Sequence, residues 1–160
     1  MAFSSNPRIG MTGSGHAPRI LWGRHEADSQ SFKKGQLGYL ASGYLTADAS
    51  DTAQILGIAM FDATNVTSGH VTGDVIVLRP GDEIKIRVTN GGTDTRITAA
   101  NLGIGYGLYV ASNVCYLDLA DTSNDRFQIT KMLYESDGST VSYWAVATIP
   151  ATVLQYATGA

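Results

Sequence analysis

Three histidines and one cysteine are the residues of this sequence best suited to metal binding or nucleophilic chemistry. His16, His25 and His70 lie in separate polar segments, and no two have the short spacing that places two metal ligands on one element. Cys115 lies in the apolar stretch 114–117, which favours a buried thiol in a protein assembled in a reducing compartment. We therefore expect exposed loop histidines, a buried cysteine, and neither a metal nor a cofactor.

Two further segments have the composition of ligand-binding loops. Residues 103–107 are rich in glycine like a nucleotide-binding loop, but the last glycine comes one position too early and no amphipathic helix follows. We interpret them as a turn that passes close to a neighbouring strand, with Tyr106 and Tyr109 on opposite sides. Residues 118–125 carry oxygen ligands that suit calcium, without the EF-hand spacing, and such residues also bond their own backbone in turns.

Catalytic motifs are not recognisable in the sequence. Ser14 stands between two glycines but lacks the residues that flank a nucleophile elbow. A carboxylate pair for glycoside cleavage stays open, because Asp51, Asp62 or Asp118 could meet in the folded chain. Without a recognisable catalytic set, we expect a protein that is not an enzyme.

The elements that must position these residues are short strands. One segment, Glu83–Thr89, alternates strictly, so that Ile84, Ile86 and Val88 face a core and the charged residues between them face water. Other short apolar segments recur between turn residues, which is typical of a sandwich or barrel. Strands are expected at 38–40, 43–45, 54–61, 74–78, 105–110, 114–119, 126–133 and 142–149, with a type II turn at 79–82 and one helical turn within 98–102. We predict an all-β fold, a single β-barrel or β-sandwich domain of about eight or nine strands.

Residues 1–34 differ from the rest and are predicted to form an extended N-terminal arm, followed by a β-domain over residues 35–160. The segment is rich in Gly, Ser, Asn and Pro and has few apolar residues. It carries five basic and two acidic residues, a net charge of +3. Because the whole chain has a net charge of −3, residues 35–160 carry −6. A basic arm attached to an acidic body is typical of an interaction segment.

Trp22 lies between Arg19 and Arg24, and Trp and Arg are the side chains found most often at the energetic centres of interfaces. Two interpretations stay open, since Trp22 either contacts a partner or folds back on its own domain. The residues predicted to contact a partner are Arg19, Trp22, Arg24 and Phe32, with Tyr39 and Tyr44 as secondary candidates.

The composition narrows the class of partner. Charged residues make up 16% of the chain, below the roughly 25% of typical soluble domains, so much of the surface suits contact with another protein. The acidic body would repel phosphate, and nucleic acid is not expected as a partner. No apolar run reaches the ~20 residues that cross a bilayer, and the first residues lack a signal-peptide pattern. We expect synthesis in a cytosol and no membrane.

The order of the segments between about Phe32 and Ile149 resembles that of the capsid decoration, or cement, proteins of tailed bacteriophages, which are small head proteins encoded near the major capsid gene. The segments that carry the resemblance consist of glycines, aromatics and strand residues rather than reactive groups. They are Phe32–Leu40, Ile55–Ala59, Val75–Leu78, Gly81–Asp82, Tyr106–Val110, Tyr116–Thr122, Arg126–Ile129 and Trp144–Ala147.

The resemblance implies a β-rich virion structural protein that binds the outer surface of the phage head and stabilises the major capsid lattice. Its partners would be the major capsid protein and further copies of the chain around a capsid symmetry axis, after assembly in the host cytoplasm. A second hypothesis is a carbohydrate- or receptor-binding β-domain displayed on a virion or cell surface, with Tyr39, Tyr44, Tyr106 or Tyr109 as stacking platforms.

Overall fold

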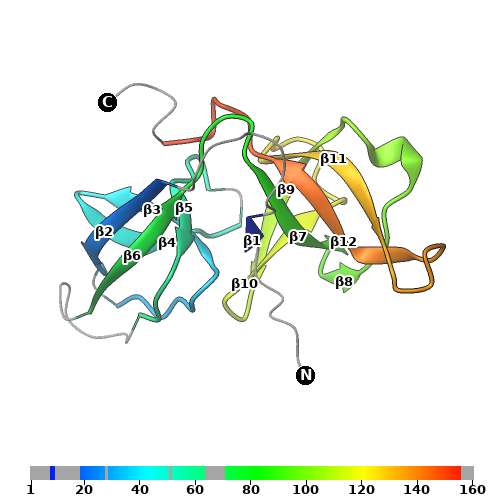
Figure 1. Cartoon of the computed structure of the whole chain (residues 1–160). Coiled ribbons are helices and arrows are strands. Elements are labelled where there is room, and N and C mark those ends of the chain that lie inside the picture. Colours follow the sequence, from blue (N-terminus) through cyan, green and yellow to red (C-terminus); the bar gives the residue numbers. More distant parts are fainter. Residues whose placement is uncertain (1–7, 10–18, 28, 51, 64–70, 156–160) are drawn as a thin grey trace.

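The computed structural model describes residues 8–9, 19–27, 29–50, 52–63 and 71–155, whose strands form two β-sheets that lie side by side (Figure 1). The all-β prediction is confirmed. The N-terminal sheet contains β2 (Arg19–His25), β3 (Leu37–Ala41), β4 (Tyr44–Ala47), β5 (Gly57–Ala59) and β6 (Thr72–Val77). The second sheet contains β1 (Arg8–Ile9), β7 (Glu83–Asn90), β8 (Thr93–Asp94), β9 (Gly105–Ala111), β10 (Val114–Asp118), β11 (Phe127–Tyr134) and β12 (Val141–Thr148), and the 3₁₀ turn η1 spans Ala99–Asn101.

The second sheet closes into a small barrel. Its strands follow one another in the order β7, β10, β9, β11 and β12, and β12 pairs with β7 again. The pairing of β7 with β10 is parallel, and the other pairings around the ring are antiparallel. The predicted alternation of β7 is confirmed, because Ile84, Ile86 and Val88 are fully buried inside the barrel. Cys115 of β10 is buried beside them, as expected from its apolar neighbours.

The N-terminal sheet has the order β2-β6-β5-β3-β4 and curls around its own core. Its two edge strands come together after β2, where Glu26 forms a β-bridge with Leu45 and the amide of Ala27 donates to the carbonyl of Leu45 at 3.0 Å. The predicted strands 38–40 and 43–45 correspond to β3 and β4, which form an antiparallel hairpin. The buried side chains enclosed by this sheet are Phe32, Leu45, Leu56, Ala59, Ala63, Val75 and Val77.

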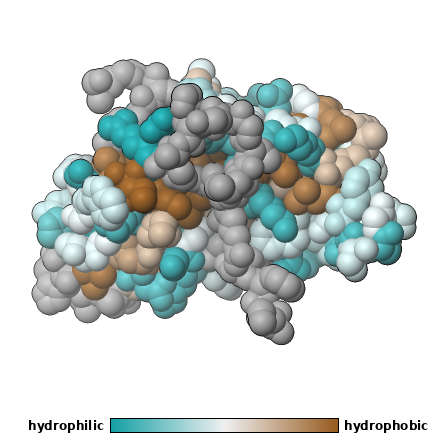
Figure 2. All heavy atoms as spheres, viewed as in Figure 1, coloured by the Kyte–Doolittle hydropathy of each residue, from teal (hydrophilic) through white to brown (hydrophobic). Residues whose placement is uncertain are grey.

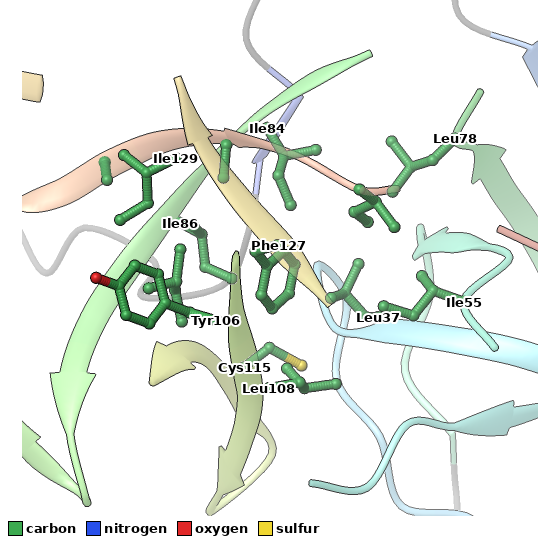
Figure 3. Close-up of a cluster of buried hydrophobic side chains, with 14 of the residues drawn as sticks. Leu37, Ile55, Leu78, Ile84, Ile86, Tyr106, Leu108, Cys115, Phe127 and Ile129 are labelled. Carbon is green, nitrogen blue, oxygen red and sulfur yellow. The ribbon is translucent and has the colours of Figure 1, made fainter. Parts of the chain in front are cut away.

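A continuous apolar core joins the two sheets. Figure 3 shows Phe127 of the barrel beside Leu37 and Ile55, which come from the N-terminal part of the chain. Leu78, which follows β6, and Leu154, near the end of the described chain, belong to the same cluster. Because side chains from the first sheet complete the core of the second, the two sheets fold as one packed unit.

The structure differs from the expected arm at residues 1–34. Arg19–His25 is strand β2, which pairs with β6, and Phe32 is 2% exposed within the core of the N-terminal sheet. Arg8–Ile9 forms the short strand β1 beside β7, while residues 1–7 and 10–18 lie outside the described residues. The described part of the segment therefore belongs to the β-body. Its polar composition concealed a strand because an edge strand needs one backbone partner and few apolar side chains.

The number of strands is also larger than the predicted eight or nine, since twelve strands occur in the described ranges. The additional ones are β1, β2 and β8, none of which has a clear apolar alternation. The long strand expected at 54–61 is shortened to Gly57–Ala59, because the amide of Ile55 donates instead to Val153 at 2.8 Å. The 79–82 turn is confirmed, with Gly81 at a φ of 88° and the amide of Asp82 donating to Arg79 at 3.0 Å.

Gly57 should be the least replaceable glycine of the N-terminal sheet. A Cβ at this position would lie 1.9 Å from the carbonyl oxygen of Ile76 on the adjacent strand, so the backbone must move to accept any side chain. We expect Gly57→Ala to lower the free energy of unfolding by roughly 3 kcal/mol, measured by denaturant titration. Gly103→Ala is the matched control, because its site is open and only its φ of 76° opposes a side chain, at about 1 kcal/mol. Equal losses for both variants would contradict the packing argument.

Candidate functional site

A β-bulge in β2 presents the most exposed large apolar side chain among the described residues. Leu21 pairs with Val75 and Arg24 pairs with Gly73, so that Trp22 and Gly23 together oppose the single residue Asp74. Gly23 has a φ of 60°, a conformation that glycine adopts without strain. Its amide donates to Oδ1 of Asp74 at 3.1 Å, which fixes the bulge on β6.

Trp22 is 71% exposed on the outer side of this strand. Leu21 packs inward on the core of the N-terminal sheet, so the adjacent side chains of Ile20 and Trp22 point to the outer face. Ile20 pairs with Ile76 of β6, and both are partly exposed. Figure 2 shows hydrophobic residues gathered over this part of the molecule. The interpretation in which Trp22 folds back on its own domain is therefore wrong.

Three other predicted contact residues lie on the same part of the chain or close to it. Arg19 is exposed at the start of β2, and Arg24 is partly buried just after the bulge. Tyr44, on β4, is 39% exposed, and its ring meets the ring of His25 edge to face with centroids 6.5 Å apart. Arg19 and Arg24 pair with Val77 and Gly73, on the same face of β6 as Val75, the partner of Leu21, so the two arginines do not share the face of Trp22. We name the exposed aromatic residues Trp22 and Tyr44 the bulge surface.

Phe32 does not belong to the bulge surface, although its residue type suggested a contact. Its ring packs edge to face on Phe61, with centroids 5.3 Å apart, inside the core. Tyr39, the other secondary candidate, is partly buried in β3. The sequence alone could not distinguish the buried Phe32 from the exposed Trp22, because both lie in the same polar segment.

The two suspected ligand loops have structural explanations. Both positions require glycine, because a Cβ at Gly105 would collide with the carboxylate of Asp125 and a Cβ at Gly107 with that of Asp121. Oδ1 of Asp121 in turn accepts hydrogen bonds from the amides of Ser123 and Asn124, as the turn interpretation predicts. Among the described residues, no group of three or more His, Cys, Asp or Glu side chains is placed to hold a metal ion.

The carboxylates considered for catalysis are engaged in separate places. Asp62 accepts the amide of Lys34 at 2.7 Å and pairs with the Lys33 ammonium at 3.5 Å. The hydrogen bond from Lys34 lowers the pKa of Asp62. Asp118, at the end of β10, accepts the amides of Gly91 and Ala120 at 2.8 and 3.0 Å. Asp51, His16 and His70 lie outside the described residues.

Sequence reasoning missed a row of side chains that crosses four strands of the barrel. Trp144 of β12 is the register partner of Arg87, Arg87 pairs with Tyr116, and Tyr116 pairs with Tyr109. We name these four residues the aromatic row. Alternation along β7 already predicted that Arg87 faces outward, but cross-strand register cannot be derived from a single sequence.

Asp48 is a buried carboxyl where the two sheets meet. It follows β4, is 2% exposed, and neither of its carboxyl oxygens has a hydrogen-bond partner. Burial raises the pKa of Asp48 well above its usual range, and the positive charge of Arg126 partly opposes this. Burial also raises the pKa of Cys115 to about 12, which makes its thiol a poor nucleophile.

Comparisons with protein-family models, with curated proteins and with solved structures find no match for this chain. Among the described residues, no helix is long and apolar enough to span a bilayer. The candidate site therefore rests on the geometry of the chain itself.

Truncation of Trp22 and truncation of Phe32 should change the free energy of unfolding by very different amounts. We expect Trp22→Ala to change the free energy of unfolding by less than about 0.5 kcal/mol, because its side chain is mostly in water. Phe32→Ala should cost about 3–5 kcal/mol, because it opens a cavity in the core. Denaturant titrations of both variants measure the difference, and a large loss for Trp22→Ala would mean that the indole supports the fold.

Asp48→Asn should alter how stability depends on pH. Because the pKa of Asp48 is raised in the folded state, its contribution is fully present below the unfolded pKa of about 4 and is lost as the pH rises through the folded pKa. The neutral variant should therefore melt a few degrees above the wild type at pH 7 and lose this advantage near pH 4.

Asp62→Asn is the control for this measurement, since its lowered pKa gives the opposite sign. The Asp62 contribution is present above the unfolded pKa and is lost as the pH falls, so this variant should be slightly less stable at pH 7. Thermal unfolding between pH 4 and 8 tests both. If Asp48→Asn and wild type keep a constant difference across this range, Asp48 is not the responsible group.

Proposed function

We propose that this chain is a non-enzymatic virion structural protein that binds the outer surface of a phage head and reinforces the major capsid lattice. The order of its strand segments, which resembles that of decoration proteins, supports the proposal. The observation that carries it is the 71% exposure of Trp22 on a bulge anchored to a packed sheet. In this proposal the protein is assembled in the host cytoplasm and stays on the outside of the virion.

Trp22 has the properties of an interface anchor. A large aromatic side chain fixed on a sheet loses little conformational entropy when it enters a partner's pocket. The hydrogen bond of Gly23 to Asp74 holds the bulge in place before any partner arrives. Because the exposed group is an indole, the complementary surface of the major capsid protein is expected to offer an apolar pocket.

Stabilisation of a lattice follows from differential binding. A cement protein that binds the mature lattice more tightly than the immature or disrupted one shifts the equilibrium toward the mature shell. Self-association around a symmetry axis would let several bulge surfaces act together, which raises the overall avidity without new contacts. A rigid body suits this role, and the core shared by the two sheets supplies one.

The proposal is tested by co-sedimentation of the full chain with undecorated heads of the phage that encodes it. We expect saturable binding that weakens at least about tenfold in Trp22→Ala. Tyr134→Ala is the matched control, because Tyr134 is also an exposed aromatic, at 53%, but lies on β11 of the barrel. A deletion of residues 1–34 is unsuitable, since it would remove β2 and Phe32 from the fold.

Each result of this experiment decides a separate point. Loss of binding with Trp22→Ala but not with Tyr134→Ala supports docking through the bulge surface. Equal binding by both variants and the wild type would retain the head as partner but reject the bulge surface. Absence of binding by the wild-type chain would reject the capsid function.

A further inference from the structure

The aromatic row forms a continuous strip across the outer wall of the barrel. Trp144, Arg87, Tyr116 and Tyr109 are successive register partners on the neighbouring strands β12, β7, β10 and β9. Side chains of directly opposed residues on one face of a sheet have Cβ atoms about 5 Å apart. The four side chains therefore follow one another without a gap across the strands.

The strip faces outward, because its neighbours along each strand face inward. Ile86 and Val88 on β7 are fully buried, as are Cys115 and Leu117 on β10. Figure 3 shows Ile86, Cys115 and Leu108 inside the barrel. Side chains alternate along a strand, so the row lies on the opposite face, where all four of its residues are partly exposed.

Three aromatic rings and two cationic groups meet in this strip. The rings of Tyr109 and Tyr116 are tilted by 53° with centroids 6.2 Å apart. The ammonium of Lys85 lies 5.3 Å from the centroid of the Trp144 ring. Between them, the guanidinium of Arg87 forms an ion pair with Asp94, whose carboxylate remains partly exposed.

This combination of groups fits one ligand chemistry better than others. Aromatic rings offer flat apolar surfaces to the C–H faces of sugar rings, while an arginine and a carboxylate supply donors and acceptors for hydroxyl groups. The sheet faces and loops of other five-stranded barrels bind oligonucleotides and oligosaccharides. A nucleic acid is less well matched, because Asp94 lies in the strip and the chain carries a net charge of −3.

We propose that the aromatic row is a binding site for an extended, uncharged oligosaccharide, with sugar rings stacked on Trp144, Tyr116 and Tyr109 and hydroxyl groups bonded to Arg87 and Asp94. The strip crosses the strands rather than entering a pocket, so its ligand is a chain of several sugars and not a single one. The site lies on the barrel, whereas the bulge surface lies on the N-terminal sheet, and it does not depend on head binding.

Tryptophan fluorescence measures this binding directly. The chain has two tryptophans, so Trp22→Phe leaves Trp144 as the only one and makes the emission specific for the row. This full-length variant is titrated separately with cellohexaose, maltohexaose, hexa-N-acetylchitohexaose, polygalacturonate and oligo-dT. We expect a saturable change with at least one of the three neutral oligosaccharides, and at least a tenfold weaker affinity when Tyr116→Ala is added.

Two further variants separate binding from folding. Arg87→Lys keeps a positive charge but loses the planar guanidinium, so it should weaken binding while the thermal melt stays close to that of the parent. Tyr134→Ala, outside the row, should leave the affinity unchanged. The proposal is overturned by no saturable response to any neutral oligosaccharide, by binding that survives Tyr116→Ala, or by a response confined to polygalacturonate or oligo-dT.

Discussion

Burial of apolar side chains between the barrel and the N-terminal sheet is the interaction on which the rest of the structure depends. Phe127 and Ile84 fill the barrel, and Leu37 and Ile55 of the other part of the chain continue the same core. The chain returns to this junction at its end, where the side chain of Gln155 bonds both the amide and the carbonyl of Leu40, at 2.8 and 2.7 Å. If the two sheets separated at the junction, each would expose part of its apolar core to water.

Because the core is shared, the outer faces of both sheets are held rigidly in one body. The bulge surface and the aromatic row both consist of outward side chains on strands whose inward neighbours are buried. Leu21, the neighbour of Trp22, packs on the core of the N-terminal sheet. Ile86 and Val88, the neighbours of Arg87, are buried in the core of the barrel. Such a scaffold positions binding side chains before a ligand arrives, which reduces the entropy that binding must overcome.

The same junction contains the one feature that opposes stability most clearly in the described chain. Asp48 is enclosed there without a hydrogen-bond partner for its carboxyl, near the charge of Arg126 and the thiol of Cys115. A buried carboxyl in these surroundings favours its neutral form, so the junction is expected to be more stable in mild acid. The apolar contacts around it, rather than ionic pairing, therefore hold the two sheets together.

The sequence by itself determined the local features of this protein. The alternation in Glu83–Thr89 predicted strand β7 correctly, and the Pro-Gly pair predicted the turn that precedes it. Both features depend on neighbouring residues only. Strand β2 was missed, and Phe32 was assigned to an interface, because their environment comes from β6 and Phe61, which are distant in sequence. The aromatic row likewise depends on the register of four strands. Cross-strand pairing is a long-range property, so only the tertiary structure decided which side chains share a surface.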